Sequence, residues 1–512
     1  MYLHTKITQF PYSIILVRCV KTMLPLAFYI VGICFVVTML WKNVRRRYRL
    51  PPGPRFELPI VGSSMYLGSQ PQVTLTIMSQ QYGSIFRLHL GRDLVVVLND
   101  YESIRKLLSL EETTGRPRNT KLDSMLGGNA GLAFSDGDLW KEHRRFALSA
   151  LRDLGMGKSW LQEQILDETD QLIKALAATN EKPINPHHLV ITTISNLICA
   201  TAFGKRYNYD DEDFRALLRN EHQCEEQLSE MSALDVFPIL RFVPPFRKVY
   251  QRRMNVVQIR REHMQRVIDD TRSSDNKDGQ RLDYVNLYLE ERKRQQGEGA
   301  DTTFTDEQLL RCVSDLFGAG TMTTTSSILF GLLLMVENPE VVRTVHAELD
   351  TIAERNEQIL VKHKGHLPYT EAVITEIQRL IPVVPLSVPH RITAPIAFNE
   401  YIFPADTLII PNIYAAHHDP KLWEEPEVFD PSRFVDSDGK FAKSPYVIHF
   451  SLGKRACPAE AMGQAELFLV LTNILHKFDL LVPDGVHISS QNVAVNITTV
   501  PKPFQLIFKR RF

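Results

Sequence analysis

A cysteine near the C-terminal end of the chain stands in a context suited to metal binding. Cys457 ends the run 450–457 (FSLGKRAC), which also contains Phe450, Gly453 and Arg455. A glycine lets a loop approach a flat ligand closely, an arginine pairs with carboxylates, and a thiolate binds iron. A cysteine taken alone is more often an inert, buried side chain. The surrounding residues favour iron ligation, and zinc is disfavoured because no second cysteine or histidine lies at ligand spacing.

Two other segments offer groups that suit carboxylate ligands. Trp140 and Arg144 are four residues apart, about one helical turn, so both side chains can point the same way. His390 lies in the run 388–391 (VPHR). Cations and N–H donors suit carboxylates. The alternatives are core packing for Trp140 and an ordinary hydrogen-bonded histidine for His390.

A long apolar helix is predicted from Thr305 to Asn338, with a capping pattern at Thr305 and Gln308. About 33 residues at 1.5 Å each give a length of about 50 Å, enough to cross a large domain. Its nearly uncharged middle contains the run 318–324 (GAGTMTT), whose glycines and hydroxyls favour a kink. A local rule broken inside a core marks a functional position. The alternative for Thr323 is a hydrogen bond to the carbonyl four residues earlier.

A helical pair of opposite charges is predicted at Glu376 and Arg379, three residues apart on one face. The E-x-x-R spacing alone is weak evidence, because it also begins at Glu102, Glu142, Glu212, Glu291 and Glu340, where ordinary surface pairs are expected. Glu376 differs because the run 429–434 (FDPSRF), with Arg433, follows it.

Composition places the chain among ordinary globular proteins. Of 512 residues, 44% are hydrophobic and 23% charged, and 59 basic residues balance 59 acidic ones, so nothing indicates a nucleic-acid partner. The length permits one large domain or several ordinary ones. The six cysteines are widely spaced, without a C-x-x-C pair, and are interpreted as reduced thiols facing cytosol.

An N-terminal membrane anchor is predicted at 23–41, a run without charge and close to the roughly 20 residues that cross a bilayer. Basic residues are more numerous after this run than before it, which favours its C-terminal side as cytosolic. A cleaved signal peptide is the alternative, but its apolar core would be shorter. The predicted organisation is an extension (1–22), the anchor (23–41), a basic and proline-rich hinge (42–54) and a catalytic domain (55–512).

Together these segments resemble the cytochrome P450 family. The run 450–457 is similar to the haem loop F-x-x-G-x-R-x-C, and 319–324 to A-G-x-(acid)-T-(T/S). Trp140 and Arg144 match a W-x-x-x-R helix, and the two segments around Glu376 and Arg433 match E-x-x-R and P-x-R-F. The likeness covers nearly the whole chain from Pro51. It is strongest to the animal microsomal clan, whose members oxidise drugs, steroids and fatty acids.

The resemblance implies a mainly α fold with a small β region, in which a long central helix lies over haem. It implies that Cys457 is the axial thiolate ligand of haem b (iron protoporphyrin IX) and that Thr323 holds a catalytic water near bound dioxygen. The other residues implied to bind haem are Trp140, Arg144, His390, Phe450 and Arg455, with Arg116 a weaker candidate. The candidates for the substrate pocket are Ala319, Val384 and Val388. A buried structural triad is implied for Glu376, Arg379 and Arg433.

The implied activity is that of a monooxygenase, an oxidoreductase that inserts one oxygen atom from O2 into a hydrophobic small molecule such as a xenobiotic, steroid or fatty acid. Electrons would come from NADPH through the membrane-bound NADPH–cytochrome P450 reductase, and the resemblance allows cytochrome b5 as a further partner. The implied location is the endoplasmic reticulum membrane, with the catalytic domain on the cytosolic side.

Two positions depart from the family pattern and keep other functions open. Met322 stands where the family has an acid, and a thioether cannot relay protons. Ala459 replaces the usual glycine two residues after the cysteine, and one added methyl group is expected to be tolerated. Met322 motivates a second hypothesis, the rearrangement or dehydration of peroxides without a reductase. A third is a protein that senses gas or carries haem without turnover.

Overall fold

The structure is a computed structural model that describes residues 49–58, 61–118, 128–157, 159–229, 234, 238–273, 283–299 and 301–511. The predicted extension and anchor, and most of the hinge, lie outside these residues. Within them, one helix is long and apolar enough to cross a membrane, α12 (Asp306–Glu337), and 78% of its apolar window is buried in the protein. α12 is therefore a core helix.

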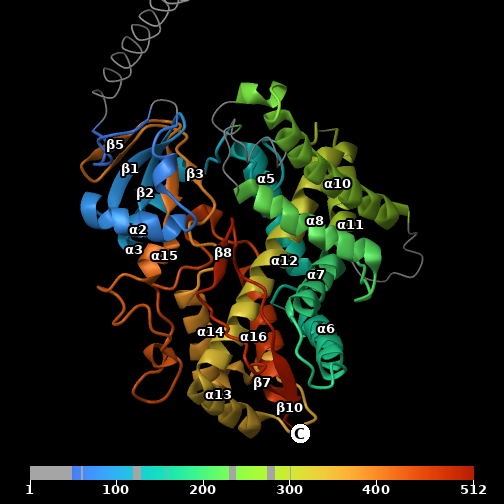
Figure 1. The fold of residues 1–512 in the computed structure, drawn as a ribbon. Coiled ribbons are helices and arrows are strands. Elements are labelled where there is room, and N and C mark those ends of the chain that lie inside the picture. Colours follow the sequence, from blue (N-terminus) through green and yellow to red (C-terminus); the bar gives the residue numbers. More distant parts are fainter. Residues whose placement is uncertain are drawn as a thin grey trace, which may run out of the picture.

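α12 crosses the centre of the helical part of the molecule (Figure 1). Its N-cap is Thr305, whose side chain accepts a hydrogen bond from Gln308 N at 3.1 Å, as predicted. The Gln308 side chain does not complete the capping box, because it bonds both backbone groups of Gly131. The helix is unbroken through 318–324, so the glycines there do not interrupt it. The predicted long helix is confirmed.

The other helices pack around α12 or flank a small sheet. Prolines at the first position begin α13 and α14, where the missing N–H costs no hydrogen bond. The helices are α2 (Pro71–Tyr82), α3 (Tyr101–Leu108), α5 (Gly137–Asp153), α6 (Ser159–Ala177), α7 (His187–Phe203), α8 (Glu212–Ser229), α10 (Phe246–Ser273), α11 (Tyr284–Gly297), α13 (Pro339–Ile352), α14 (Pro368–Leu380), α15 (Ile413–His417) and α16 (Glu460–Lys477). Short 3-10 helices are η1 (Ser64–Tyr66), η2 (Glu111–Thr113), η3 (Pro238–Phe242), η4 (Val361–His366), η5 (Pro431–Phe434) and η6 (Gly453–Arg455).

A four-stranded sheet lies to one side of the helices, in the order β1–β2–β6–β3. β1 (Ile85–Leu90) and β2 (Asp93–Leu98) form an antiparallel hairpin, whose turn uses the left-handed backbone of Gly91. β6 (Leu408–Pro411) runs parallel to β2, and β3 (His390–Arg391) antiparallel to β6. Two-stranded pairs are formed by β4 (Ile396–Phe398) with β5 (Tyr401–Phe403), β7 (Phe478–Leu481) with β10 (Ile507–Arg510), and β8 (Val493–Val495) with β9 (Thr499–Pro501). The mainly α fold with a small β region is confirmed.

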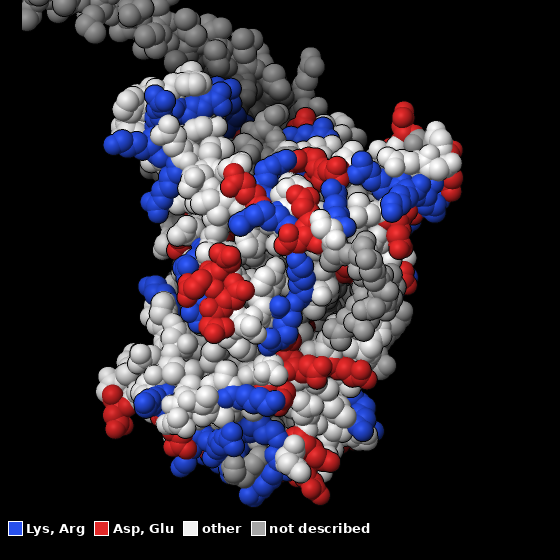
Figure 2. Space-filling model, turned by 90° about the vertical axis from the view of Figure 1, so that its right-hand side faces the viewer, with Lys and Arg blue, Asp and Glu red and all other residues white. Residues whose placement is uncertain are grey.

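The face of the molecule on the side of α10 and α11 carries side chains of both charges (Figure 2). Several form exposed pairs between helices, such as Arg261 with Glu307 and Arg272 with Asp306, both at 2.5 Å. Such pairs contribute little to stability. The mixture agrees with the equal numbers of acidic and basic residues in the chain.

Candidate active site

The segment 450–457 is a tight loop that leads directly into α16. Cys457 N donates to Phe450 O at 3.0 Å, which closes the loop. Gly453 has a φ of 75°, and a Cβ at this position would lie 2.0 Å from the carbonyl oxygen of Leu108 in α3. The glycine that was expected to face a flat ligand is thus required by the approach of the loop to the α3 backbone.

Cys457 is half-buried and lies three residues before the first residue of α16. Burial raises the pKa of its thiol, whereas the hydrogen bond from the Ala459 amide and the charge of Arg144 act to lower this pKa. Ala459 has an ordinary negative φ of −108°, so alanine stands there without backbone strain. The described residues contain no cluster of three side chains able to hold a metal ion. A metal at Cys457 would therefore receive fewer than three ligands from the described residues and need others from a bound group.

Three arginines, called here the cation cluster, lie near this loop: Arg116, Arg144 and Arg455. Arg455 donates to Thr114 O at 2.8 Å and Ser135 O at 2.5 Å, and its guanidinium carbon lies 3.8 Å from the centre of the Trp140 ring. Arg144 donates to Ala456 O at 2.6 Å, next to Cys457.

Arg116, the weaker candidate from sequence, is buried within this cluster. It donates to Ala133 O at 2.9 Å and to the carbonyls of Val388 and Pro389 at 3.1 and 3.0 Å. Burial and the charge of its arginine neighbours lower the pKa of Arg116 to about 9 and that of Arg455 to about 8. The positive charges of the cluster therefore destabilise one another in the protein without a bound anion.

The charge of the cation cluster is not balanced by the described residues. Asp136 acts on Arg116 and Arg455, but its carboxylate already pairs with Arg118 and Arg391. Trp140 Nε1 is buried, and no acceptor among the described residues receives its N–H. Buried cations and unsatisfied donors are unfavourable unless an acceptor is bound. The arrangement fits a planar group bearing carboxylates, as haem does with its two propionates.

His390 is buried at the start of β3 and shares a hydrogen bond of 2.8 Å between Nδ1 and Thr113 O. A carbonyl can only accept, so Nδ1 carries the proton and Nε2 of the neutral ring is an acceptor. Burial, with the charges of Arg116 and Arg455, lowers the pKa of His390 to about 3. His390 can therefore donate to a carboxylate only if the negative charge of that carboxylate raises the pKa of the ring enough for Nε2 to take up a proton.

One face of α12 is more exposed than the rest of the helix. Ala319 is exposed and Leu316, Thr323 and Ser327 are half-buried, although most of α12 is buried. These spacings of three and four residues place the four side chains on one helical face. Thr323 Oγ1 donates to Ala319 O at 2.7 Å, so its proton is engaged and its oxygen can accept from a water. Met322 is 5% exposed and packs in the apolar core.

The other pocket candidates, Val384 and Val388, are both half-buried on the segment between α14 and β3. The neighbouring Val383 accepts a hydrogen bond of 2.7 Å from Thr499 N, at the start of β9. Val388 O accepts from Arg116, which connects this segment to the cation cluster. Partly exposed apolar side chains on a fixed segment are what the wall of an apolar pocket requires.

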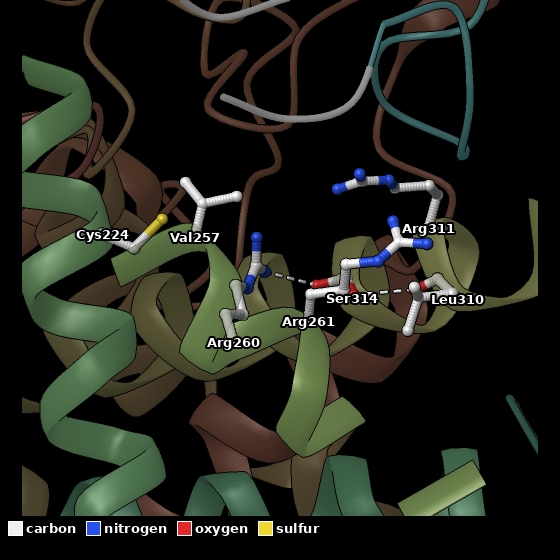
Figure 3. A pocket seen from close by; sticks show the side chains of 7 residues that line it. All are labelled: Cys224, Val257, Arg260, Arg261, Leu310, Arg311 and Ser314. Atoms are coloured by element: carbon white, nitrogen blue, oxygen red, sulfur yellow. Dashed lines mark hydrogen bonds between the residues drawn. The ribbon is translucent and has the colours of Figure 1, made fainter. Parts of the chain in front are cut away.

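Polar groups that were not predicted from the sequence join α8, α10 and α12. Arg260 pairs with Glu221 at 2.6 Å. It also donates to Ser314 O at 2.7 Å (Figure 3). Gly318 makes room for Arg260, since a Cβ there would lie 2.7 Å from its guanidinium. Asp315 accepts from Leu132 N and Ala133 N at 2.7 and 2.9 Å. α12 thus fixes both α10 and the loop before α5.

The three members of the predicted triad lie together. Arg379 donates to Glu376 at 2.6 and 2.8 Å, and both side chains are fully buried. Arg433 in η5 lies 3.5 Å from the same carboxylate, and Asp430 N donates to it at 2.9 Å. By contrast, the pairs that start at Glu102 and Glu212 lie at the surface. The triad joins α14 to η5.

Comparisons with known proteins agree with these features. The family model described as Cytochrome P450 matches residues 51–508. Cytochrome P450 2C3 of Oryctolagus cuniculus is 36% identical over 94% of this chain and 98% of its own length. Cytochrome P450 18a1 of Drosophila melanogaster is 34% identical over 94% of this chain and 91% of its own length. Cytochrome P450 2C41 of Canis lupus familiaris is 35% identical over 93% of this chain and 97% of its own length. The chain belongs to the cytochrome P450 family and is a haem-dependent monooxygenase, an oxidoreductase.

Proposed function

We propose that the protein uses haem ligated by Cys457 to insert one oxygen atom from O2 into a hydrophobic small molecule, with electrons from NADPH. The observation that carries this proposal is the unbalanced cation cluster beside Cys457, together with the unpartnered N–H of Trp140. Bound haem would supply the activation of O2, which consumes two electrons and two protons and yields one water for each oxygen atom inserted.

The side chains of the chain divide the remaining work. Arg144, Arg455, Trp140 and Arg116 would hold the two carboxylates, because among the described residues the three guanidiniums donate to neutral carbonyl oxygens and the Trp140 N–H has no acceptor. Thr323 would hold a water through its free lone pairs. Ala319, Val384 and Val388 would contact the substrate, and their apolar surface favours an apolar molecule.

The electron donor is proposed to be a membrane-bound reductase that docks near Lys454 and Lys141. Lys454 lies three residues before Cys457, so a donor docked there approaches the haem by a short route. Both lysines are about half exposed and share the carboxylate of Glu111, and Lys141 also lies 3.9 Å from the carboxylate of Asp138. Complementary charge steers such an encounter and speeds its association rate.

We further propose that the protein lies on the endoplasmic reticulum membrane. The uncharged run 23–41 and the basic residues after it support this location. Large apolar side chains are exposed before α2, at Phe56 and Met65, and in and after η3, at Ile239, Phe242 and Val243. The chain segments that carry them lie toward the same end of the molecule (Figure 1, blue and bright green). Exposed apolar patches favour contact with a membrane.

The test combines the purified full-length protein with reductase, NADPH and isotopically labelled dioxygen in membranes. The proposal predicts a product that contains one labelled oxygen atom and NADPH consumption that depends on the substrate. A product whose oxygen comes from water, or oxidation independent of both NADPH and reductase, would overturn it.

Peroxide rearrangement without a reductase is the second candidate. The burial of Met322 favours it, because this position then offers no proton to bound dioxygen. Turnover of an organic hydroperoxide in the absence of NADPH and reductase would support this candidate. Strict dependence on both would eliminate it.

A further inference from the structure

A cavity of about 340 Å³ lies between α14 and α16, and the proposed mechanism does not use it. The two helices contact each other and lie side by side in Figure 1. The lining residues recur at helical spacing, so each helix presents one face to the cavity. They are Glu371, Ile374, Thr375 and Gln378 of α14, and Glu460, Gln464 and Phe468 of α16. Residues of the segment 441–452 supply the remaining wall, together with Lys364.

This cavity is separate from the proposed substrate pocket but touches the haem loop. Of the described residues that line it, none belongs to the exposed face of α12 or to the segment 383–388. Phe450 and Leu452 line it instead, and Phe450 O accepts a hydrogen bond from Cys457 N at 3.0 Å. A molecule bound in the cavity would therefore contact the loop that holds Cys457 without entering the substrate pocket.

Two glutamine amides that line the cavity have unused hydrogen-bonding groups. Gln464 Nε2 lies 3.3 Å from Gln378 Oε1 and 3.3 Å from His449 Nε2. An amide nitrogen can only donate, so these contacts use both N–H groups of Gln464, and its carbonyl oxygen has no donor among the described residues. Gln378 is 7% exposed, and its own N–H groups meet no acceptor in the described part of the chain. The two joined amides therefore offer a bound molecule one donor and one acceptor.

Aromatic side chains line the cavity beside these amides. They are Phe441, Phe450 and Phe468. Phe468 is 1% exposed and Ile374 is 5% exposed, so the buried part of the lining includes apolar surface. Aromatic rings pack favourably against another aromatic ring, either offset or edge to face. The lining therefore suits a planar aromatic molecule that also carries a hydrogen-bonding group.

The charged residues of the lining balance one another. They are two lysines and two glutamates, namely Lys364, Lys443, Glu371 and Glu460. Lys364 lies 3.7 Å from Glu371. Burial and the charge of Lys443 lower the pKa of His449 to about 3, so this ring adds no charge at neutral pH. A lining without net charge favours a neutral molecule, because an ion would lose water without gaining a matching charge.

We propose that this cavity is a second small-molecule site, which binds a neutral aromatic carboxamide or lactam. The oxygen of the bound amide accepts from Gln378, its N–H donates to the carbonyl oxygen of Gln464, and its ring packs against the phenylalanines. A carboxylate brings no donor for Gln464, and an ammonium brings no acceptor for Gln378, so each leaves one amide group of the cavity unpaired. The inference goes beyond the proposed oxidation, because the molecule bound here is not the one that is oxidised.

The first experiment locates the site by photolabelling of the full-length holoenzyme with a naphthamide that carries a diazirine. The label should be saturable and should be found by mass spectrometry in peptides from 368–380, 441–452 and 460–477. Unlabelled naphthamide should compete about tenfold better than naphthoate or naphthylmethylamine, which have the same ring but the wrong hydrogen-bonding group. Labelling confined to α12 or to 383–388, labelling that does not saturate, or equal competition by the three compounds would overturn the proposal.

Three variants test the residues that recognise the amide. Gln378→Leu and Gln464→Leu keep the size of the side chain and should each weaken naphthamide binding about tenfold. Gln265→Leu is the matched control, because Gln265 lies at the surface of α10 and bonds Asp269, and it should bind as the natural protein does. Thr375→Phe fills the cavity without removing either glutamine and should block labelling. Full labelling in Thr375→Phe, or unchanged affinity in both cavity leucine variants, would contradict the assignment.

Amide hydrogen exchange gives a second readout that needs no turnover. Naphthamide should slow exchange several-fold in the segment 441–457 of the holoenzyme, because the bound ring packs against Phe450, whose carbonyl accepts from Cys457 N. The protection should be lost in Gln378→Leu and kept in Gln265→Leu. Protection of α12 alone would place the molecule in the substrate pocket and overturn the proposal. Both measurements are independent of NADPH and reductase, so a failure of the proposed oxidation would leave their outcome unchanged.

Discussion

Two clusters of buried charge in this protein differ in how completely they are paired. In the triad, all five N–H groups of Arg379 have acceptors, namely Glu376 and the carbonyls of His417, Pro426 and Val428. In the cation cluster, Arg116, Arg144 and Arg455 donate to carbonyl oxygens, and the nearby Asp136 is already paired with other arginines.

The difference separates a structural cluster from a ligand site. The Glu376–Arg379 pair is complete in the folded chain, so it leaves neither of these two buried charges unpaired. An open cluster becomes favourable only when an anion binds. Removal of a triad residue should therefore damage the fold, whereas removal of a cluster residue should mainly weaken haem binding.

The largest effect is predicted for Glu376→Ala. It leaves two arginines in a buried position without their carboxylate, so the free energy of unfolding should fall by about 3–5 kcal/mol, with or without haem. Glu102→Ala removes an exposed pair of the same spacing and should cost less than about 1 kcal/mol. Urea unfolding of the natural protein and of the two variants measures these free energies. Equal stability of the two variants would contradict the distinction between the buried triad and the exposed pair.

Arg455→Met is predicted to act on haem affinity. Loss of a charge-assisted hydrogen bond of about 1.5–3 kcal/mol should weaken haem binding roughly 10- to 100-fold. The haem-free protein should unfold at the same or a higher urea concentration, because one uncompensated cation is gone. Haem titration of the haem-free variant tests this. Intact affinity together with a loss of stability would make Arg455 a structural residue like Arg379.

His390 should give the haem-free protein a distinct pH dependence. Its pKa is lowered to about 3 in the fold, so the stability it contributes is complete above its ordinary pKa of 6.5 and is lost as pH falls from 6.5 toward 3. The loss approaches about 1.4 kcal/mol per pH unit. H390Q should remove this contribution to the pH dependence of the free energy of unfolding. Bound haem should reduce the same contribution, because a carboxylate raises the pKa of His390. Identical slopes in both haem-free proteins would refute this.

The smallest effect is predicted for the exposed cation next to the site. Lys454→Glu should slow reduction by the reductase several-fold at low salt, and the difference should shrink as salt screens the charges. Haem content and reduction by dithionite should be unchanged, because Lys454 is outside the buried cluster. A rate that is unchanged at every salt concentration would place the docking surface elsewhere.

Local sequence signals predicted the elements that carry the site. Thr305 and Gln308 correctly marked the beginning of α12. The triad could be picked from six E-x-x-R matches only through a second segment far along the chain. Patterns that combine a spacing with a distant partner were therefore the informative ones.

Features that depend on packing could not be predicted. Nothing in the spacing of Glu466 distinguishes it from a surface residue of an amphipathic helix, and its burial follows from contact with α12. The role of Gly453 in meeting the Leu108 carbonyl likewise requires the position of α3. The pairing of Glu221 with Arg260 joins two helices whose relative placement no local pattern encodes.

The most direct test is the carbon monoxide spectrum of the reduced protein, compared with that of Cys457→Ser. We expect the natural protein to show the spectrum characteristic of thiolate ligation and the variant to lose it while other buried cysteines, such as Cys199 and Cys312, stay in place. An unchanged spectrum in the variant would show that the iron is held by another residue and would contradict the assignment of Cys457.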